Sequence, residues 1–151
     1  MRDDLWLHQR FVYLWQTHFA DVTDGNEIVI RFGRKSKSRL GSITLRHKDR
    51  VSKPLTRRQA YFLTHTDAVS VITINGRLRD LAHPEQVIDA VIAHEFCHYY
   101  HGFNSKRKRM FSHPHAGGII EKECYERGLH DTMKFQKRWL KENWKNIVLS
   151  S

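Results

Sequence analysis

The sequence predicts an α+β fold in a single domain that spans residues 1–151. Apolar side chains recur at helical spacing near both ends and in the centre of the chain, and short β-branched runs lie between them. A chain of 151 residues with 40% hydrophobic content can bury one core, and neither a repeat nor a Pro- or Gly-rich linker divides it. We therefore expect one compact unit in which helices pack on a small sheet.

The first part of the chain predicts one helix followed by strands. Residues 5–20 place apolar side chains at the spacing of a helix with a broad buried face. A turn-like, basic segment at 34–39 joins the first two strands, and Asn75-Gly76 after the third is a strong turn signal. The three strands are expected at 27–33, 40–47 and 69–74.

A largely buried helix is expected over residues 84–101. Val87, Val91 and Phe96 recur at helical spacing. Pro84 suits the first turn of a helix, where its missing N–H is no loss, and Gly102 is a natural stop. This helix carries the most informative motif of the chain.

That motif is HExxH, formed by His94, Glu95 and His98. Histidines four residues apart lie on one helical face and can ligate a single metal ion, while the Glu can reach a water at that ion. The motif predicts a Zn²⁺-dependent hydrolase with Glu95 as the catalytic base. The alternative is a core helix whose polar side chains are satisfied by hydrogen bonds, which is unfavourable because three polar groups would need partners.

A catalytic zinc ion takes three protein ligands, so a third must come from elsewhere in the chain. The metzincin pattern HExxHxxGxxH fails, because His101 and Asn104 occupy the positions of its Gly and final His. Two sources remain. The candidates are a carboxylate among Glu121, Glu123 and Glu126, of which Glu123 is favoured, or an imidazole of His113 or His115.

With these motifs the chain resembles the SprT-like zinc metallopeptidases, a family that includes the Spartan DNA–protein crosslink proteases. The resemblance rests on HEFCH at 94–98, with Cys97 in the fourth place, and on His115-Ala116-Gly117-Gly118-Ile119, which is similar to the family's HGxxF or HGxxW. Ala116 and Ile119 depart from the Gly and the aromatic residue of that pattern. The resemblance covers most of residues 8–130, and it implies His115 as the third zinc ligand beside His94 and His98.

The resemblance also implies the fold and the activity. The fold would be zincin-like, with an N-terminal helix, a three-stranded sheet, the HExxH helix, a ligand-bearing helix and a C-terminal helix. The activity would be a zinc endopeptidase that acts on a protein or peptide substrate. His101 follows on nearly the same helical face, so it is either an oxyanion helper or, by a narrow preference, a helix-end residue paired with backbone.

A formal net charge of +10 and a pI near 9.9 predict anionic partners. DNA is the partner that the resemblance implies, and Phe103 and Phe111 are candidates for base stacking. The alternative is a solvated surface that aids solubility. The candidate DNA-binding residues are Arg34, Lys35, Lys37 and Arg39 in one cluster, and Lys106, Arg107, Lys108 and Arg109 between the two metal motifs.

The termini and the cysteines bear on location and domain content. The charged start of the chain is neither a signal peptide nor a membrane span, and only Cys97 and Cys124 are present, so we expect a reducing cytoplasm and no membrane partner. Cys97 is expected in the core. The C-terminal segment 131–151 replaces the four-cysteine zinc ribbon of many SprT-like proteins with an amphipathic helix, which we expect to dock on the core rather than act as a lid.

Three classes of function are therefore open. The first is a DNA-associated metalloprotease. The second is a small gluzincin-like peptidase without a nucleic-acid role, which would use Glu123 as a ligand. The third is a non-catalytic zinc-binding module, against which the intact Glu95 argues, because a structural site needs no base.

Overall fold

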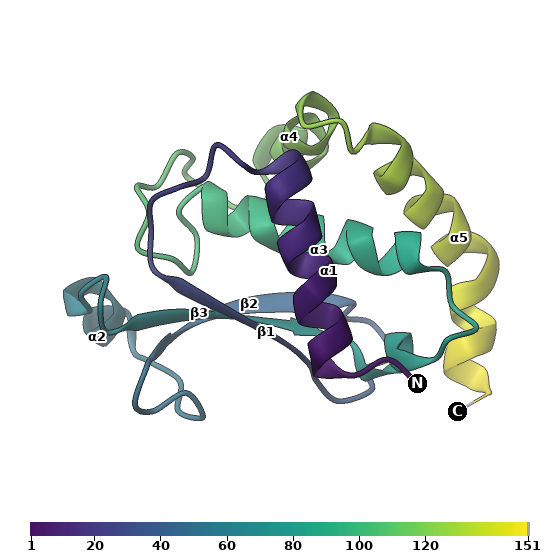
Figure 1. Cartoon of the computed structure of the whole chain (residues 1–151), viewed down its shortest axis with the longest axis horizontal. Coiled ribbons are helices and arrows are strands. Elements are labelled where there is room, and N and C mark those ends of the chain that lie inside the picture. Colours follow the sequence, from purple (N-terminus) through teal and green to yellow (C-terminus); the bar gives the residue numbers. More distant parts are fainter. Residues whose placement is uncertain (151) are drawn as a thin grey trace.

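The structure is a computed structural model that describes residues 1–150, and it confirms the α+β class (Figure 1). Within these residues five α-helices accompany one mixed sheet of three strands. The elements in chain order are α1 (Asp4–His18), β1 (Glu27–Phe32), β2 (Gly41–His47), α2 (Arg57–Phe62), β3 (Ala68–Ile74), η1 (Gly76–Arg79), α3 (Glu85–Tyr100), η2 (Ala116–Gly118), α4 (Ile119–Glu126) and α5 (His130–Leu149), where η marks a 3₁₀ helix.

The last strand in sequence, β3, lies at the centre of the sheet. It pairs in parallel with β1 and antiparallel with β2, so β1 and β2 are the two edges. Its β-branched residues are almost all buried, as suits a central strand. The basic loop between β1 and β2 is therefore not a hairpin turn. It carries the chain past the end of β3, where Gly33 donates a backbone hydrogen bond to Ile74.

Helices α1 and α3 lie over one face of the sheet, with α1 crossing α3 (Figure 1). The aromatic ring of Phe96 on α3 packs against Phe11, Trp15 and Phe19, with ring centroids 4.4 to 5.5 Å apart. Twelve of the sixteen residues of α3 are buried. This burial leaves one stretch of the helix for polar side chains.

Helix α5, at the yellow end of the chain in Figure 1, packs against α3. Its residues Met133, Phe135, Trp139 and Trp144 are partly buried against the core. The expected docking of this amphipathic helix is therefore found. Among residues 1–150, no helix combines the length and the apolar character needed to cross a membrane.

The turn signal Asn75-Gly76 follows β3 and begins the 3₁₀ helix η1. Asn75 is buried and caps η1, accepting a hydrogen bond from the Arg77 amide. Its side-chain amide donates to the carbonyls of Ser36 and Arg39, and its carboxamide oxygen also accepts from the Ser36 amide. One side chain therefore holds the loop 33–40 against the end of β3.

Helix α2 was not expected from the sequence, although the signal is present. Thr56 and Gln59 form a capping box, in which each side chain satisfies the other's backbone amide. None of its residues is buried, and it projects beyond the end of the sheet (Figure 1). The absence of an apolar face is the reason that helical periodicity did not reveal it.

Both cysteines lie in the core, as expected for Cys97. The Cys97 and Cys124 sulfur atoms are 3.6 Å apart between α3 and α4, and both residues are fully buried. A hydrogen bond to Cys124 and burial together raise the pKa of the Cys97 thiol. The thiol therefore stays protonated at neutral pH, the form that is a poor metal ligand and a poor nucleophile.

Replacing Asn75 should destabilise the protein more than an ordinary surface change. Asn75→Ala leaves the Arg39 carbonyl without its side-chain donor, removes one of two donors to the Ser36 carbonyl, and deprives the Ser36 and Arg77 amides of their acceptor. We expect the free energy of unfolding to fall by about 2–4 kcal/mol. Asn143→Ala is the matched control, because its side chain donates only to Trp139 in its own helix. Urea unfolding measures both, and an equal loss in the two variants would contradict the role given to Asn75.

Candidate metal centre

Helix α3 fixes two of the predicted metal ligands. Pro84 precedes its first turn, and Gly102, with a φ of +86°, ends it in a conformation that favours glycine. Between these ends His94 and His98 lie one turn apart on the same face. Their Nε2 atoms are 3.2 Å from each other.

The third histidine arrives from the loop between α3 and α4. His115 immediately precedes η2, and Gly117 and Gly118 both have positive φ, which lets the chain turn sharply into α4. The His115 Nε2 lies 3.4 Å from the His94 Nε2, and its ring centroid is 4.6 Å from that of His98. The structure therefore brings His94, His98 and His115 together with their ligand atoms within 4.8 Å of one another.

This geometry fits a single metal ion. Imidazole nitrogens about 2.0–2.1 Å from a tetrahedral ion stand roughly 3.3 Å apart, close to the two distances found here. Burial lowers the pKa of His94, and burial with the neighbouring His94 lowers the pKa of His98 to about 4. Both rings are therefore neutral at pH 7, which is the form that binds a metal.

Glu95 lies beside this cluster and is only 6% exposed. Burial raises its pKa to about 7, with Arg39 acting in the opposite direction. Strand β2 approaches the carboxylate closely because Gly41 has no side chain: a Cβ there would lie 2.7 Å from Val91 Cγ1 and 3.3 Å from Glu95 Cγ. Glu95 is thus held between α3 and the start of β2.

An open cavity of about 340 Å³ connects these groups. His94, Glu95 and His98 line it from α3, and Pro114 and His115 from the loop. Its other wall is the first half of β2, an edge strand of the sheet. The three histidines therefore stand at the side of a cleft that a substrate can enter.

The alternative ligands lie elsewhere. His113 is exposed and does not belong to the cluster. Glu123 Oε1 accepts a hydrogen bond from His101 Nε2 at 3.0 Å, and its Oε2 accepts one from Arg127 at 2.9 Å. The fully buried His101 is thus a helix-end residue, as preferred, but its partner is a carboxylate rather than the backbone.

Two of the basic residues after α3 already have hydrogen-bond partners within the protein, and a third, Arg109, stacks over the ring of Phe103. Lys106 Nζ donates to the backbone carbonyls of Ala60 and Tyr61, and Arg107 pairs with Asp24 and stacks over Tyr100. Lys108 and Arg109 are exposed. Of the two candidate stacking rings, Phe103 is buried and Phe111 is 37% exposed.

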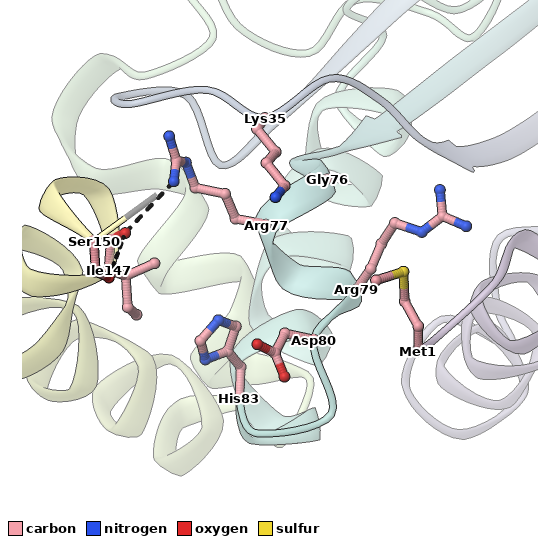
Figure 2. A pocket seen from close by; sticks show the side chains of 9 residues that line it. All are labelled: Met1, Lys35, Gly76, Arg77, Arg79, Asp80, His83, Ile147 and Ser150. Carbon is pink, nitrogen blue, oxygen red and sulfur yellow. Dashed lines mark hydrogen bonds between the residues drawn. The ribbon is translucent and has the colours of Figure 1, made fainter.

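The other basic cluster, Arg34, Lys35, Lys37 and Arg39, is exposed on the loop 33–40. Figure 2 shows Lys35 over a hollow of about 240 Å³ that Arg77, Arg79 and His83 also line. This hollow does not include the metal cluster. Arg39, by contrast, lines the cleft beside Glu95, a place that the sequence did not indicate.

Comparison of the chain with models of known families, with curated proteins and with solved structures finds no match. The interpretation of the site therefore rests on the geometry of its own residues.

The link between His101 and Glu123 should make stability depend on pH. The hydrogen bond from His101 lowers the pKa of Glu123 below 4.5, so its ionised form stabilises the fold above that pH, and this contribution is lost as the pH falls through the folded-state pKa. We expect Glu123→Gln to lower the free energy of unfolding by about 1–3 kcal/mol at pH 7, and by progressively less towards pH 3.

Glu126→Gln is the matched control, because Glu126 is exposed on the same helix. Urea unfolding from pH 7 to pH 3 measures the differences. A deficit in Glu123→Gln that does not change with pH, or one that Glu126→Gln shares, would show that the carboxylate charge does not stabilise this contact.

Proposed function

We propose that the protein is a zinc-dependent endopeptidase. The observation that carries this proposal is the convergence of three imidazoles with one buried carboxylate at the side of an open cleft. Three protein ligands and an accessible position are typical of catalytic zinc, whereas structural zinc is closed by four. The exposed His113 stands outside the cluster, so it does not supply a fourth ligand.

His94, His98 and His115 would hold the ion. Zinc in that position supplies Lewis acidity, which polarises a carbonyl and makes water a stronger acid. Glu95 then accepts the proton of the attacking water and delivers it to the leaving amine. Its buried setting suits both steps, because a carboxylate with a pKa near 7 can take up a proton and release it at neutral pH.

The edge of β2 gives the substrate a place to bind. An extended peptide can add to an exposed edge strand through main-chain hydrogen bonds. Residues Gly41–Thr44 of β2 face the cleft opposite His94 and Glu95. A peptide bound along them would present its backbone carbonyls to the metal, which favours cleavage within a chain.

A gluzincin-like ligand set is not favoured, because Glu123 is engaged by His101 and Arg127. Association with DNA is a second part of the proposal. It is supported by the net charge of +10 and by exposed cations on the loop 33–40 and on the loop after α3.

The metal ligands and the base should separate in a mutational test. His94→Ala and His115→Ala should lose most bound zinc, since each removes one of three ligands. Glu95→Gln should keep its zinc and lose at least about 10²-fold in turnover, because only proton transfer is removed. Zinc content by mass spectrometry and cleavage of an unfolded protein substrate measure the two properties.

His113→Ala is the matched control, two residues from His115 and outside the cluster. It should keep both zinc and activity. Full zinc occupancy in His94→Ala would refute the site, and undiminished turnover in Glu95→Gln would refute the base.

The association with DNA has its own test. If the substrates are proteins bound to DNA, single-stranded DNA should increase cleavage of a DNA-binding protein, and added salt should weaken this stimulation. Lys108→Gln/Arg109→Gln should reduce the stimulation and leave cleavage without DNA unchanged. Equal rates with and without DNA would favour a general peptidase.

A further inference from the structure

A polar hollow of about 420 Å³ adjoins the metal cleft at the start of β2. It shares Arg39, Gly41 and Ser42 with the lining of the cleft, so the two spaces are neighbours. Arg34, Ser36, Ser38 and Thr73 complete most of its lining. The hollow therefore offers two guanidinium groups and several hydroxyls next to the place where a substrate would lie.

Neither guanidinium group forms a salt bridge within residues 1–150, although Arg39 acts electrostatically on the nearby Glu95. The ion pairs of this part of the chain engage Arg10, Arg107 and Arg127 but neither Arg34 nor Arg39. No Asp or Glu lines the hollow. Two like charges are thus gathered there without a salt bridge, and the positive potential that they create favours an anion.

The loop that carries these groups is held firmly. Asn75 binds the Ser36 and Arg39 carbonyls, and the Arg34 carbonyl accepts a hydrogen bond from the Gly76 amide. The Ser36 hydroxyl accepts from the backbone amides of Ser38 and Arg39. Trp144 of α5 also donates to the Lys37 carbonyl. A loop fixed at so many points presents its cations with little further ordering cost.

We propose that this hollow is a specificity subsite that binds an acidic side chain, Asp or Glu, of a peptide lying in the metal cleft. A carboxylate there would accept charge-assisted hydrogen bonds from Arg34 and Arg39, the geometry in which guanidinium groups are most effective. The proposal rests on the proposed endopeptidase function, because it names the substrates that the cleft prefers.

A nucleic-acid backbone suits the hollow less well. A strand of phosphates needs a continuous track of cations. Here the two arginines line one recess, and in the second basic cluster Lys106 and Arg107 are engaged within the protein. A single anionic group fits this arrangement better.

The test is a binding measurement on zinc-loaded Glu95→Gln protein, in which cleavage does not interfere. The probes are two fluorescein-labelled, alanine-rich peptides that differ only in a central Glu or Gln, and the readout is fluorescence anisotropy. We expect the Glu peptide to bind about tenfold more tightly, the ratio that one hydrogen bond to a charged group supplies. The preference should disappear when Arg34→Gln and Arg39→Gln are added.

Arg58→Gln is the matched control, since Arg58 is an exposed arginine on α2 and lines neither hollow nor cleft. It should leave the preference unchanged. Zinc content and circular dichroism verify that each variant is folded, and Arg34→Gln alone should weaken the preference if the double variant does not fold.

Equal binding of the two peptides would overturn the proposal, and so would a preference that survives both substitutions. Displacement of both peptides by an oligothymidylate, without any preference for Glu, would overturn it in favour of a nucleic-acid site. Failure of the proposed function looks different: wild-type protein would cleave nothing, while the preference for Glu would remain measurable.

Discussion

The packing of Phe96 against the aromatic side chains of α1 and the segment after it sets the rotation of α3, and the rotation of α3 sets the site. Successive residues of an α-helix differ by about 100° around its axis. With Phe96 fixed in the core, His94 and His98 must point to the opposite side, and Glu95 lies between the two directions. The directions of His94, His98 and Glu95 therefore depend on an apolar contact in which none of the three takes part.

The same dependence extends to the other wall of the cleft. Strand β2 reaches Glu95 only because position 41 is a glycine, and the loop before it keeps its course because Asn75 holds its carbonyls. The groups that bind these parts together come from distant segments of the chain. Together these contacts hold the loop with its two arginines, and the edge of β2, beside the three histidines.

Local patterns in the sequence predicted the local structure. The ends of α3 follow from Pro84 and Gly102, and HExxH places His94 and His98 on one face whatever surrounds them. His115 was preferred over His113 and Glu123 through a resemblance of motifs, and the structure brings it to the other two histidines.

Contacts between segments far apart in the chain were harder to predict from the sequence. The position of β3 between β1 and β2 is a pairing of segments far apart in sequence, and no pattern within a single strand encodes it. Asn75-Gly76 predicts a turn, but the dipeptide does not indicate that the Asn75 side chain binds a loop almost forty residues upstream. The capping box of α2 could have been noticed, since both of its residues are local.

The three histidines come from two kinds of element. Two come from one rigid helix, whereas His115 ends a loop that leaves α3 at Gly102 and turns into α4 through two glycines of positive φ. An ion bound by all three would act as a cross-link that closes this loop, and its binding free energy would be reduced by the entropy of closing it. The helix would therefore determine the position of the ion, and the loop would determine how tightly the ion is bound.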